Sequence, residues 1–136
     1  MAKTRILLID DDRLILDMLK IALDKPDFEV LLATDGEMGL RLFREERPDI
    51  AIVDLAMPGM DGYDVIARMR AQEDEKTHTP IIILTAHGQN VMRTYAAELG
   101  ADLYLVKPIS TARLIEHIRE LAAQRSAADA GTAQKD

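Results

Sequence analysis

The sequence predicts an α/β protein in which one parallel sheet is covered by helices on both faces. Two observations support this. Short apolar runs without polar alternation recur along the chain, and such runs are typical of strands buried on both faces. Each run is followed by a segment with apolar residues at helical spacing, so strands and helices alternate. The 136 residues fit a single domain of ordinary size.

The first strand is expected at residues 6–9, and the first helix at residues 13–25, where Pro26 ends it. The apolar residues at helical spacing in this segment are Leu14, Ile15, Met18, Leu19, Ile21 and Ala22. The segment therefore resembles a helix that packs on a sheet.

The rest of the chain repeats this alternation four times. Pro48 precedes the third strand, Gly100 ends the fourth helix, and residues 71–79 form a polar loop. The further strands are expected at 29–33, 50–53, 80–85 and 102–106, and the further helices at 37–46, 64–70, 90–99 and 111–123. From Ser126 the chain is alanine-rich and polar without a period, so we expect a domain at 1–125 and a flexible tail at 126–136.

Composition excludes several classes of protein. There are 17 Lys and Arg against 24 Asp and Glu, a net charge of −7, which argues against direct binding of nucleic acid. The absence of cysteine excludes disulfide scaffolds and thiolate metal sites. No apolar run is long enough to span a bilayer, so we expect a cytoplasmic protein without a membrane partner.

Right-handed crossovers restrict how five such strands can be arranged. At this length the common arrangement is the flavodoxin-like (βα)5 doubly wound sheet with strand order 2-1-3-4-5. Its switch point lies between strands 1 and 3, and ligands bind beyond the carboxyl ends of the strands.

Charged and hydroxyl residues follow four of these strands. Asp10 and Asp11 follow the first strand, Asp54 the third, Thr85 ends the fourth, and Lys107 follows the fifth. Carboxylates gathered at one crevice repel each other unless a cation joins them, and a few hard oxygen ligands suit Mg²⁺. An exposed Asp54 would be a nucleophile able to form an aspartyl-phosphate, with a lysine and a hydroxyl to position the phosphoryl group. The neighbouring Asp12 is expected to cap the first helix.

With these residues in place, the sequence resembles the receiver domains of bacterial two-component response regulators from about residue 5 to residue 123. The matching segments are Ile-Leu-Leu-Ile-Asp-Asp at 6–11, Asp-Leu-Ala-Met-Pro-Gly-Met-Asp-Gly at 54–62, Ile-Leu-Thr-Ala at 83–86, Gly-Ala-Asp at 100–102, and Lys-Pro at 107–108. Their joint occurrence in this order is highly specific.

The resemblance implies a role for each matching residue. Asp54 would be the phosphoacceptor, Asp11 a direct Mg²⁺ ligand, and Asp10 a ligand acting largely through water. The backbone carbonyl of Ala56 would complete the metal site together with Asp54. Thr85 would contact the phosphoryl group and Lys107 would pair with both acceptor and phosphoryl, with a cis bond before Pro108. Tyr104 occupies the position of the aromatic switch residue.

The function implied is a phosphorylation-dependent switch rather than a turnover enzyme. A sensor histidine kinase or phosphotransfer protein would supply the phosphoryl group. The face formed by the fourth helix, fifth strand and fifth helix would then bind a downstream effector, an output domain or a second copy of the chain.

Two other classes remain open at this stage. A haloacid-dehalogenase-like phosphohydrolase would use Asp10 as nucleophile and Asp12 as acid, although Leu14 departs from that motif. A flavodoxin-like FMN binder would need a phosphate-binding loop after the first strand, where three carboxylates stand instead.

Overall fold

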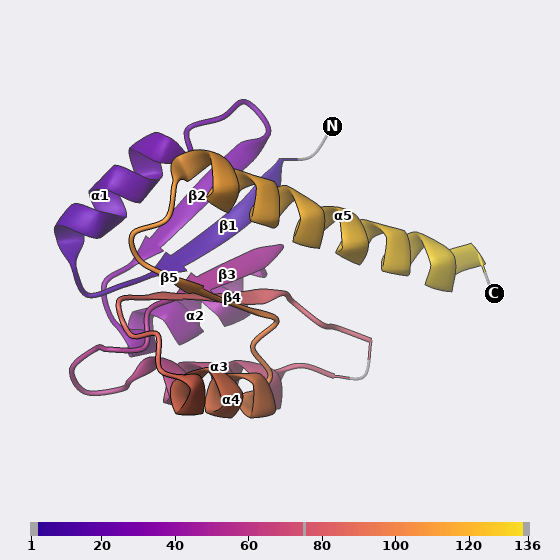
Figure 1. Cartoon of the computed structure of the whole chain (residues 1–136). Coiled ribbons are helices and arrows are strands. Elements are labelled where there is room, and N and C mark those ends of the chain that lie inside the picture. Colours follow the sequence, from indigo (N-terminus) through magenta and orange to yellow (C-terminus); the bar gives the residue numbers. More distant parts are fainter. Residues whose placement is uncertain (1–2, 75, 135–136) are drawn as a thin grey trace.

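The computed structural model describes residues 3–74 and 76–134. Five strands form one parallel sheet in the order β2-β1-β3-β4-β5, which confirms the predicted fold class and topology (Figure 1). The strands are β1 Thr4–Ile9, β2 Phe28–Ala33, β3 Ile50–Val53, β4 Ile81–Thr85 and β5 Leu103–Val106. Each overlaps its predicted range.

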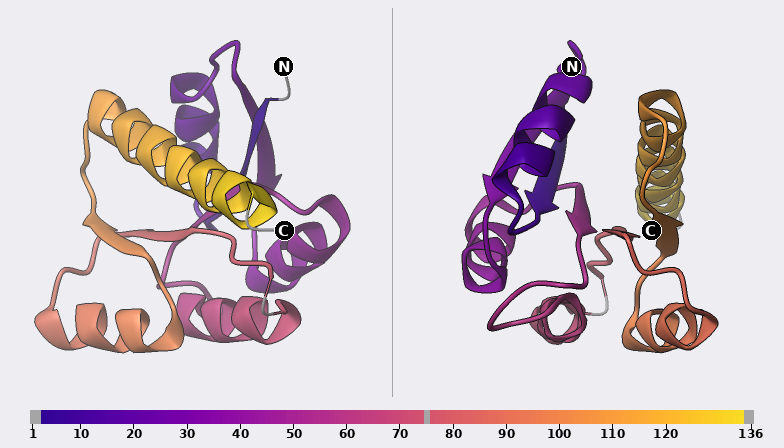
Figure 2. Two further views of the ribbon diagram at one scale, coloured as in Figure 1. Left: turned by 90° about the vertical axis from the view of Figure 1, so that its right-hand side faces the viewer. Right: turned by 60° about the vertical axis from the view of Figure 1, so that its left-hand side comes forward.

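Five helices cover the two faces of the sheet. They are α1 Arg13–Ala22, α2 Gly36–Glu46, α3 Gly62–Gln72, α4 Asn90–Leu99 and α5 Thr111–Gln134. Helices α2, α3 and α4 share one hydrophobic cluster with one face of the sheet, and α1 and α5 share another with the opposite face (Figure 2). None of the described helices combines the length and hydropathy that a membrane crossing requires.

The central strands form the core because both of their faces are covered. Every residue of β3 and β4 is buried, as are the last four residues of β1. This explains why their sequences are continuous apolar runs rather than alternating ones. The rigid centre of the sheet fixes the positions of the residues that follow these strands.

Helix α1 differs from its prediction in length and in the face that it buries. It ends at Ala22, three residues early, because Leu23 caps it and donates to the carbonyls of Leu19 and Ile21. Leu16 and Leu23 are buried. On the opposite face, Leu14, Met18 and Ile21 are 67%, 62% and 77% exposed. Helix α1 therefore has an apolar face that nothing in the described structure covers.

Residues 126–134 of the expected tail continue helix α5, which therefore extends past its predicted end at residue 123. Alanine is the strongest helix former, and residues 126–134 contain four alanines and no proline, so local propensity continues the helix beyond the core. The helix extends away from the sheet in Figure 1. Residues 135–136 of the predicted tail lie outside the described residues.

Candidate functional site

The parallel register of β1 and β3 brings Asp10 and Asp54 to the same edge of the sheet. Ile9 pairs with Val53, and the backbone N–H of Asp54 donates to the carbonyl of Ile9 at 3.0 Å. Asp10 is only 4% exposed, and Asp54, which the sequence analysis expected to be exposed, is buried at 8% because the loop after β3 closes over it, whereas Asp11 is exposed. One carboxylate oxygen from each of the three lies within 4.8 Å of the other two. The predicted acidic cluster is therefore assembled.

Lys107 reaches this cluster from the end of β5. Its Nζ lies 2.8 Å from Oδ2 of Asp10 and 3.9 Å from Oδ2 of Asp54. Its backbone N–H donates to the carbonyl of Thr85 at 2.7 Å, and the bond to Pro108 is cis, as predicted. In this state Lys107 thus pairs more closely with Asp10 than with the expected acceptor.

The pKa of Asp54 differs from that of an ordinary carboxylate. Burial raises the pKa of Asp54 above its usual value of 3.8, and the charge of Asp10 adds to this rise. The charge of Lys107 and hydrogen bonds from the Thr85 side chain and the Ala56 backbone lower the pKa, but they do not cancel the effect of burial. Ionisation of Asp54 therefore costs free energy in the folded state, and a further cation beside the carboxylate would lower that cost.

The donor set fits a Mg²⁺ ion. Asp10, Asp11 and Asp54 offer three hard oxygen ligands at mutual distances that one cation can bridge, and the exposure of Asp11 leaves room for water ligands. Ala56 is exposed in the loop after β3, next to the cluster in sequence.

Gly62 allows the loop after Asp54 to close tightly against β3. Its N–H donates to the carbonyl of Leu55 at 3.0 Å. A Cβ at this position would lie 2.5 Å from the carbonyl oxygen of Asp54 and 2.7 Å from the Cα of Leu55. Because both atoms belong to the backbone, only glycine fits here without moving the acceptor.

A chain of hydrogen bonds links Thr85 to Tyr104. Thr85 is fully buried, and its Oγ1 accepts from the backbone N–H of His87 at 3.4 Å. The carbonyl of His87 in turn accepts from the hydroxyl of Tyr104 at 2.5 Å. The guanidinium of Arg93 lies 5.0 Å from the centre of the Tyr104 ring. The two predicted switch residues are thus connected through His87, a link that the sequence did not indicate.

Asp12 has a different role from its acidic neighbours. Its side chain accepts from the backbone N–H groups of Leu14 and Ile15, which confirms the predicted N-cap of α1. The phosphohydrolase alternative requires Asp12 as a general acid, and a carboxylate occupied as a cap does not suit that role.

The sequence analysis did not identify the exposed face of α1. The signal was present: residues 14–23 contain eight apolar residues, more than one buried stripe of a short helix can hold. Helix α1 begins directly after the acidic cluster, so this face lies beside the site.

Comparison with known proteins gives the family. A model of the response regulator receiver domain matches residues 6–119. The chain belongs to the response regulator receiver domain family. This receiver domain is 30% identical to the chemotaxis protein CheY4 of Vibrio cholerae, with a TM-score of 0.82 over 88% of this chain and 99% of that one. It is 32% identical to a response regulator receiver domain protein of Clostridium thermocellum, with a TM-score of 0.83 over 93% and 98% of the two chains.

Curated relatives of this receiver domain are longer. It is 42% identical over 117 residues to the probable transcriptional regulator ycf27 of Guillardia theta, covering 86% of this chain and 44% of that protein. It is also 42% identical over 118 residues to the transcriptional regulatory protein CpxR of Klebsiella pneumoniae, covering 86% and 48%. The chain thus spans about half the length of these relatives. The phosphohydrolase alternative finds no support among the matches.

Proposed function

We propose that this receiver domain is a phosphorylation-dependent switch in which Asp54 accepts a phosphoryl group from a phosphohistidine. The donor would be a sensor histidine kinase or a phosphotransfer protein. The observation that supports this proposal most directly is the meeting of Asp54 with Asp10, Asp11 and Lys107 at one edge of the sheet.

The proposed transfer is a displacement at phosphorus. A carboxylate oxygen of Asp54 forms a bond to phosphorus while the bond between phosphorus and the donor's imidazole nitrogen breaks. The electron pair of that bond returns to the imidazole, which takes up a proton. Lys107, 3.9 Å from Asp54, would pair with the phosphoryl oxygens, and the hydroxyl of Thr85 would donate to another. Later hydrolysis of the aspartyl-phosphate would reset the switch.

Mg²⁺ held by Asp10, Asp11, Asp54 and the carbonyl of Ala56 would neutralise negative charge on the phosphoryl oxygens. Without a cation, Lys107 is the positive charge nearest to Asp10 and Asp54. We therefore propose that Lys107 shifts from Asp10 towards the phosphorylated Asp54 when Asp10 gains another positive partner.

The exposed face of α1 supports a docking role for Leu14, Met18 and Ile21. These side chains form an apolar surface beside the acceptor, and apolar patches rimmed by polar residues are typical of protein interfaces. We expect Met18→Glu to slow phosphorylation by a phosphohistidine protein that labels the parent chain, and to leave labelling by acetyl phosphate unchanged. Equal slowing with both donors would contradict a docking role.

The readout would use the link from Thr85 through His87 to Tyr104. Movement of Thr85 towards the phosphoryl group would displace the segment at His87, whose carbonyl accepts a hydrogen bond from the Tyr104 hydroxyl. Tyr104 would then move as well, and the face formed by α4, β5 and α5 would change. Val91 and Tyr95 are exposed on α4 and would contribute apolar contacts there. The occupant of this face would be an effector protein, an output domain or a second copy of the chain.

The central test is covalent labelling. Incubation with Mg²⁺ and acetyl phosphate, followed by intact mass measurement, should show one added phosphate on the parent chain and none on Asp54→Ala. Asp61→Ala is a control, since Asp61 lies seven residues away and caps α3. Persistent labelling of Asp54→Ala would show that another residue is the acceptor.

A further inference from the structure

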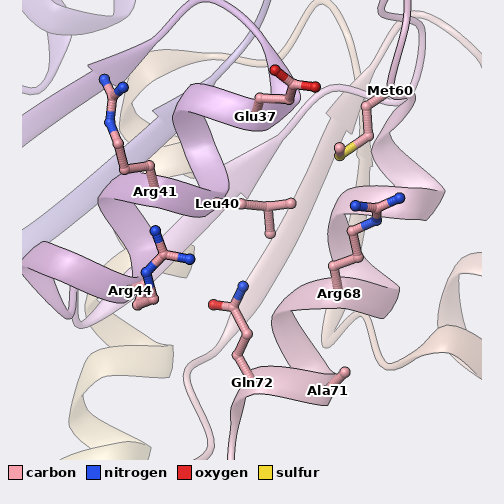
Figure 3. A pocket seen from close by; sticks show the side chains of 8 residues that line it. All are labelled: Glu37, Leu40, Arg41, Arg44, Met60, Arg68, Ala71 and Gln72. Atoms are coloured by element: carbon pink, nitrogen blue, oxygen red, sulfur yellow. The ribbon is translucent and has the colours of Figure 1, made fainter.

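Helices α2 and α3 enclose a surface hollow of about 440 Å³ on the face of the sheet opposite α1 and α5. We call this hollow the α2–α3 groove. Arg41 and Arg44 line it from α2, and Arg68 lines it from α3 (Figure 3). Met60, which is partly buried, provides apolar surface between them, and Leu40 is a core residue that is only 8% exposed at the floor of the groove. Nothing in the proposed phosphoryl transfer uses these residues.

The three arginines differ from the other arginines that hold the fold together. Arg5, Arg70, Arg119 and Arg125 each form an ion pair with a carboxylate. Within the part of the chain that the structure describes, Arg41, Arg44 and Arg68 form neither an ion pair nor a side-chain hydrogen bond. A chain with a net charge of −7 thus places three arginines outside any ion pair in one groove, where Glu37 is the carboxylate among the described lining residues.

The arrangement of the charges favours an elongated ligand over a small anion. In Figure 3 the guanidinium groups of Arg44 and Arg68 lie on either side of Leu40 and that of Arg41 points away from α3, so the three do not converge on one point. Leu40 points into the space between the two helices. A second hollow, lined by Arg47 and Phe43, continues from the first and shares Arg44 and Gln72 with it. This second hollow is lined by Glu73 and Asp74 as well as by arginines, so the hollowed surface continues past one end of the α2–α3 groove with mixed charge.

We propose that the α2–α3 groove binds an acidic amphipathic segment of a partner protein. Its carboxylates would pair with Arg41 and Arg44 on one wall and Arg68 on the other. Its apolar side chains would lie against Met60 and the small exposed part of Leu40. This chemistry follows the known mode in which an amphipathic segment lies in a groove between helices, here with charge complementarity selecting an acidic sequence.

Nucleic acid fits the groove less well. The net charge of −7 opposes every anionic ligand at long range, and it opposes nucleic acid most because each nucleotide carries a phosphate charge. An apolar surface between the arginines also offers nothing to a phosphodiester backbone. Glu37 also lines the groove and would repel any anionic group placed beside it, so the carboxylates of the partner would lie nearer to Arg44 and Arg68.

The test is selection from a random peptide display library on the full chain, with the variant Arg44→Glu/Arg68→Glu as the counter-target. Peptides retained by the parent and not by the variant should be enriched in Asp and Glu and should contain apolar residues at helical spacing. The most enriched peptide, labelled with a fluorophore, should bind the parent at least about tenfold more tightly than the double variant by anisotropy. Its affinity should fall as salt rises.

Arg113→Glu is the matched control, because Arg113 is an exposed arginine on α5, outside the groove. It should bind the selected peptide within about twofold of the parent. Phosphorylation of all variants by acetyl phosphate verifies that they are folded. Absence of enrichment, enrichment in basic peptides, or equal loss in Arg113→Glu would overturn the proposal. Displacement of the peptide by duplex DNA, or self-association of the parent that the double variant abolishes, would also overturn it.

Discussion

Asp102 directly precedes β5 and lies beside the amino end of β4. It accepts hydrogen bonds from Arg70 at 2.9 Å, from the backbone N–H of Ile81 at 2.7 Å and from His78 at 2.9 Å. At the carboxyl end of β3, Asp54 has Lys107 at 3.9 Å, and two other carboxylates are close by. The same residue type is thus paired with several donors at one edge of the sheet and crowded with like charges at the other.

This difference separates the stabilising part of the molecule from its functional part. Paired carboxylates at the amino edge join α3, β4 and β5, and removing Arg70 would leave partly buried partners such as Glu73 without their hydrogen bonds. The carboxylates at the other edge repel each other in the absence of a cation and stabilise the fold less. Removal of the paired Arg70 and removal of the charge of the crowded Asp54 should therefore change stability in opposite directions.

The largest effect is expected for Arg70→Ala. Arg70 donates to the carbonyls of Gly100 and Thr79 and pairs with Glu73 and Asp102. Removing this half-buried guanidinium should lower the free energy of unfolding by about 3 kcal/mol in urea titrations. Arg68→Ala, on the same helix, should change it by less than about 0.5 kcal/mol. Similar losses of unfolding free energy for the two variants would show that the ion pairs and hydrogen bonds of Arg70 do not stabilise the amino edge of the sheet.

Gly62→Ala should be the next most damaging. The added Cβ would meet the backbone of Asp54 and Leu55 at 2.5 and 2.7 Å, so the loop after β3 must move. We expect a loss of about 2 kcal/mol by urea unfolding and slower labelling of Asp54 by acetyl phosphate. Normal labelling with reduced stability would show that the loop adjusts without displacing the acceptor.

Asp54→Asn should stabilise the metal-free protein by about 1 kcal/mol near neutral pH. Because the pKa of Asp54 is raised in the folded state, its ionised form opposes folding at every pH above that pKa. As the pH falls from the raised pKa towards 3.8, the parent regains this stability and its difference from the variant shrinks.

Thermal unfolding across this pH range measures the Asp54→Asn effect. Mg²⁺ should stabilise the parent because it binds the folded state alone. It should stabilise the variant less, because the variant lacks the Asp54 carboxylate as a ligand. A variant that is less stable than the parent at neutral pH without metal would contradict the repulsion at this edge.

The smallest effect is expected for His78→Ala. His78 pairs with Asp102, but its side chain is 61% exposed, so solvent screens the interaction. We expect a change of less than about 0.5 kcal/mol in chemical unfolding. A loss as large as that of Arg70→Ala would show that the exposed pair carries the stability assigned to the buried one.

Much of the fold and the site could be predicted because both follow from where strands end. The apolar runs before Asp10 and Asp54 locate β1 and β3, and parallel strands place their carboxyl ends at one edge. Lys107 and Thr85 follow from the same reasoning. The individual roles of these residues in phosphoryl transfer stay predictions until labelling tests them.

The misses concern contacts that periodicity does not encode. Helix α1 has apolar residues on either side of a polar stripe, so the sequence did not show that Leu14 and Met18 would face outward. Residues 126–134 continue α5 because alanine favours a helix. The sequence analysis did not predict this because these residues show no apolar periodicity. The network of Arg70 joins residues about thirty positions apart, which local patterns do not connect.

The position of β5 at the edge of the sheet gives the domain unequal mechanical stiffness. β1, β3 and β4 hold Asp10, Asp54 and Thr85 between neighbours on both sides, whereas β5 is hydrogen-bonded to β4 alone. Displacing β5 therefore disturbs one ladder of hydrogen bonds instead of two. Lys107 and Tyr104 both belong to this softer end of the sheet, so the domain can change shape there while its acidic residues stay fixed.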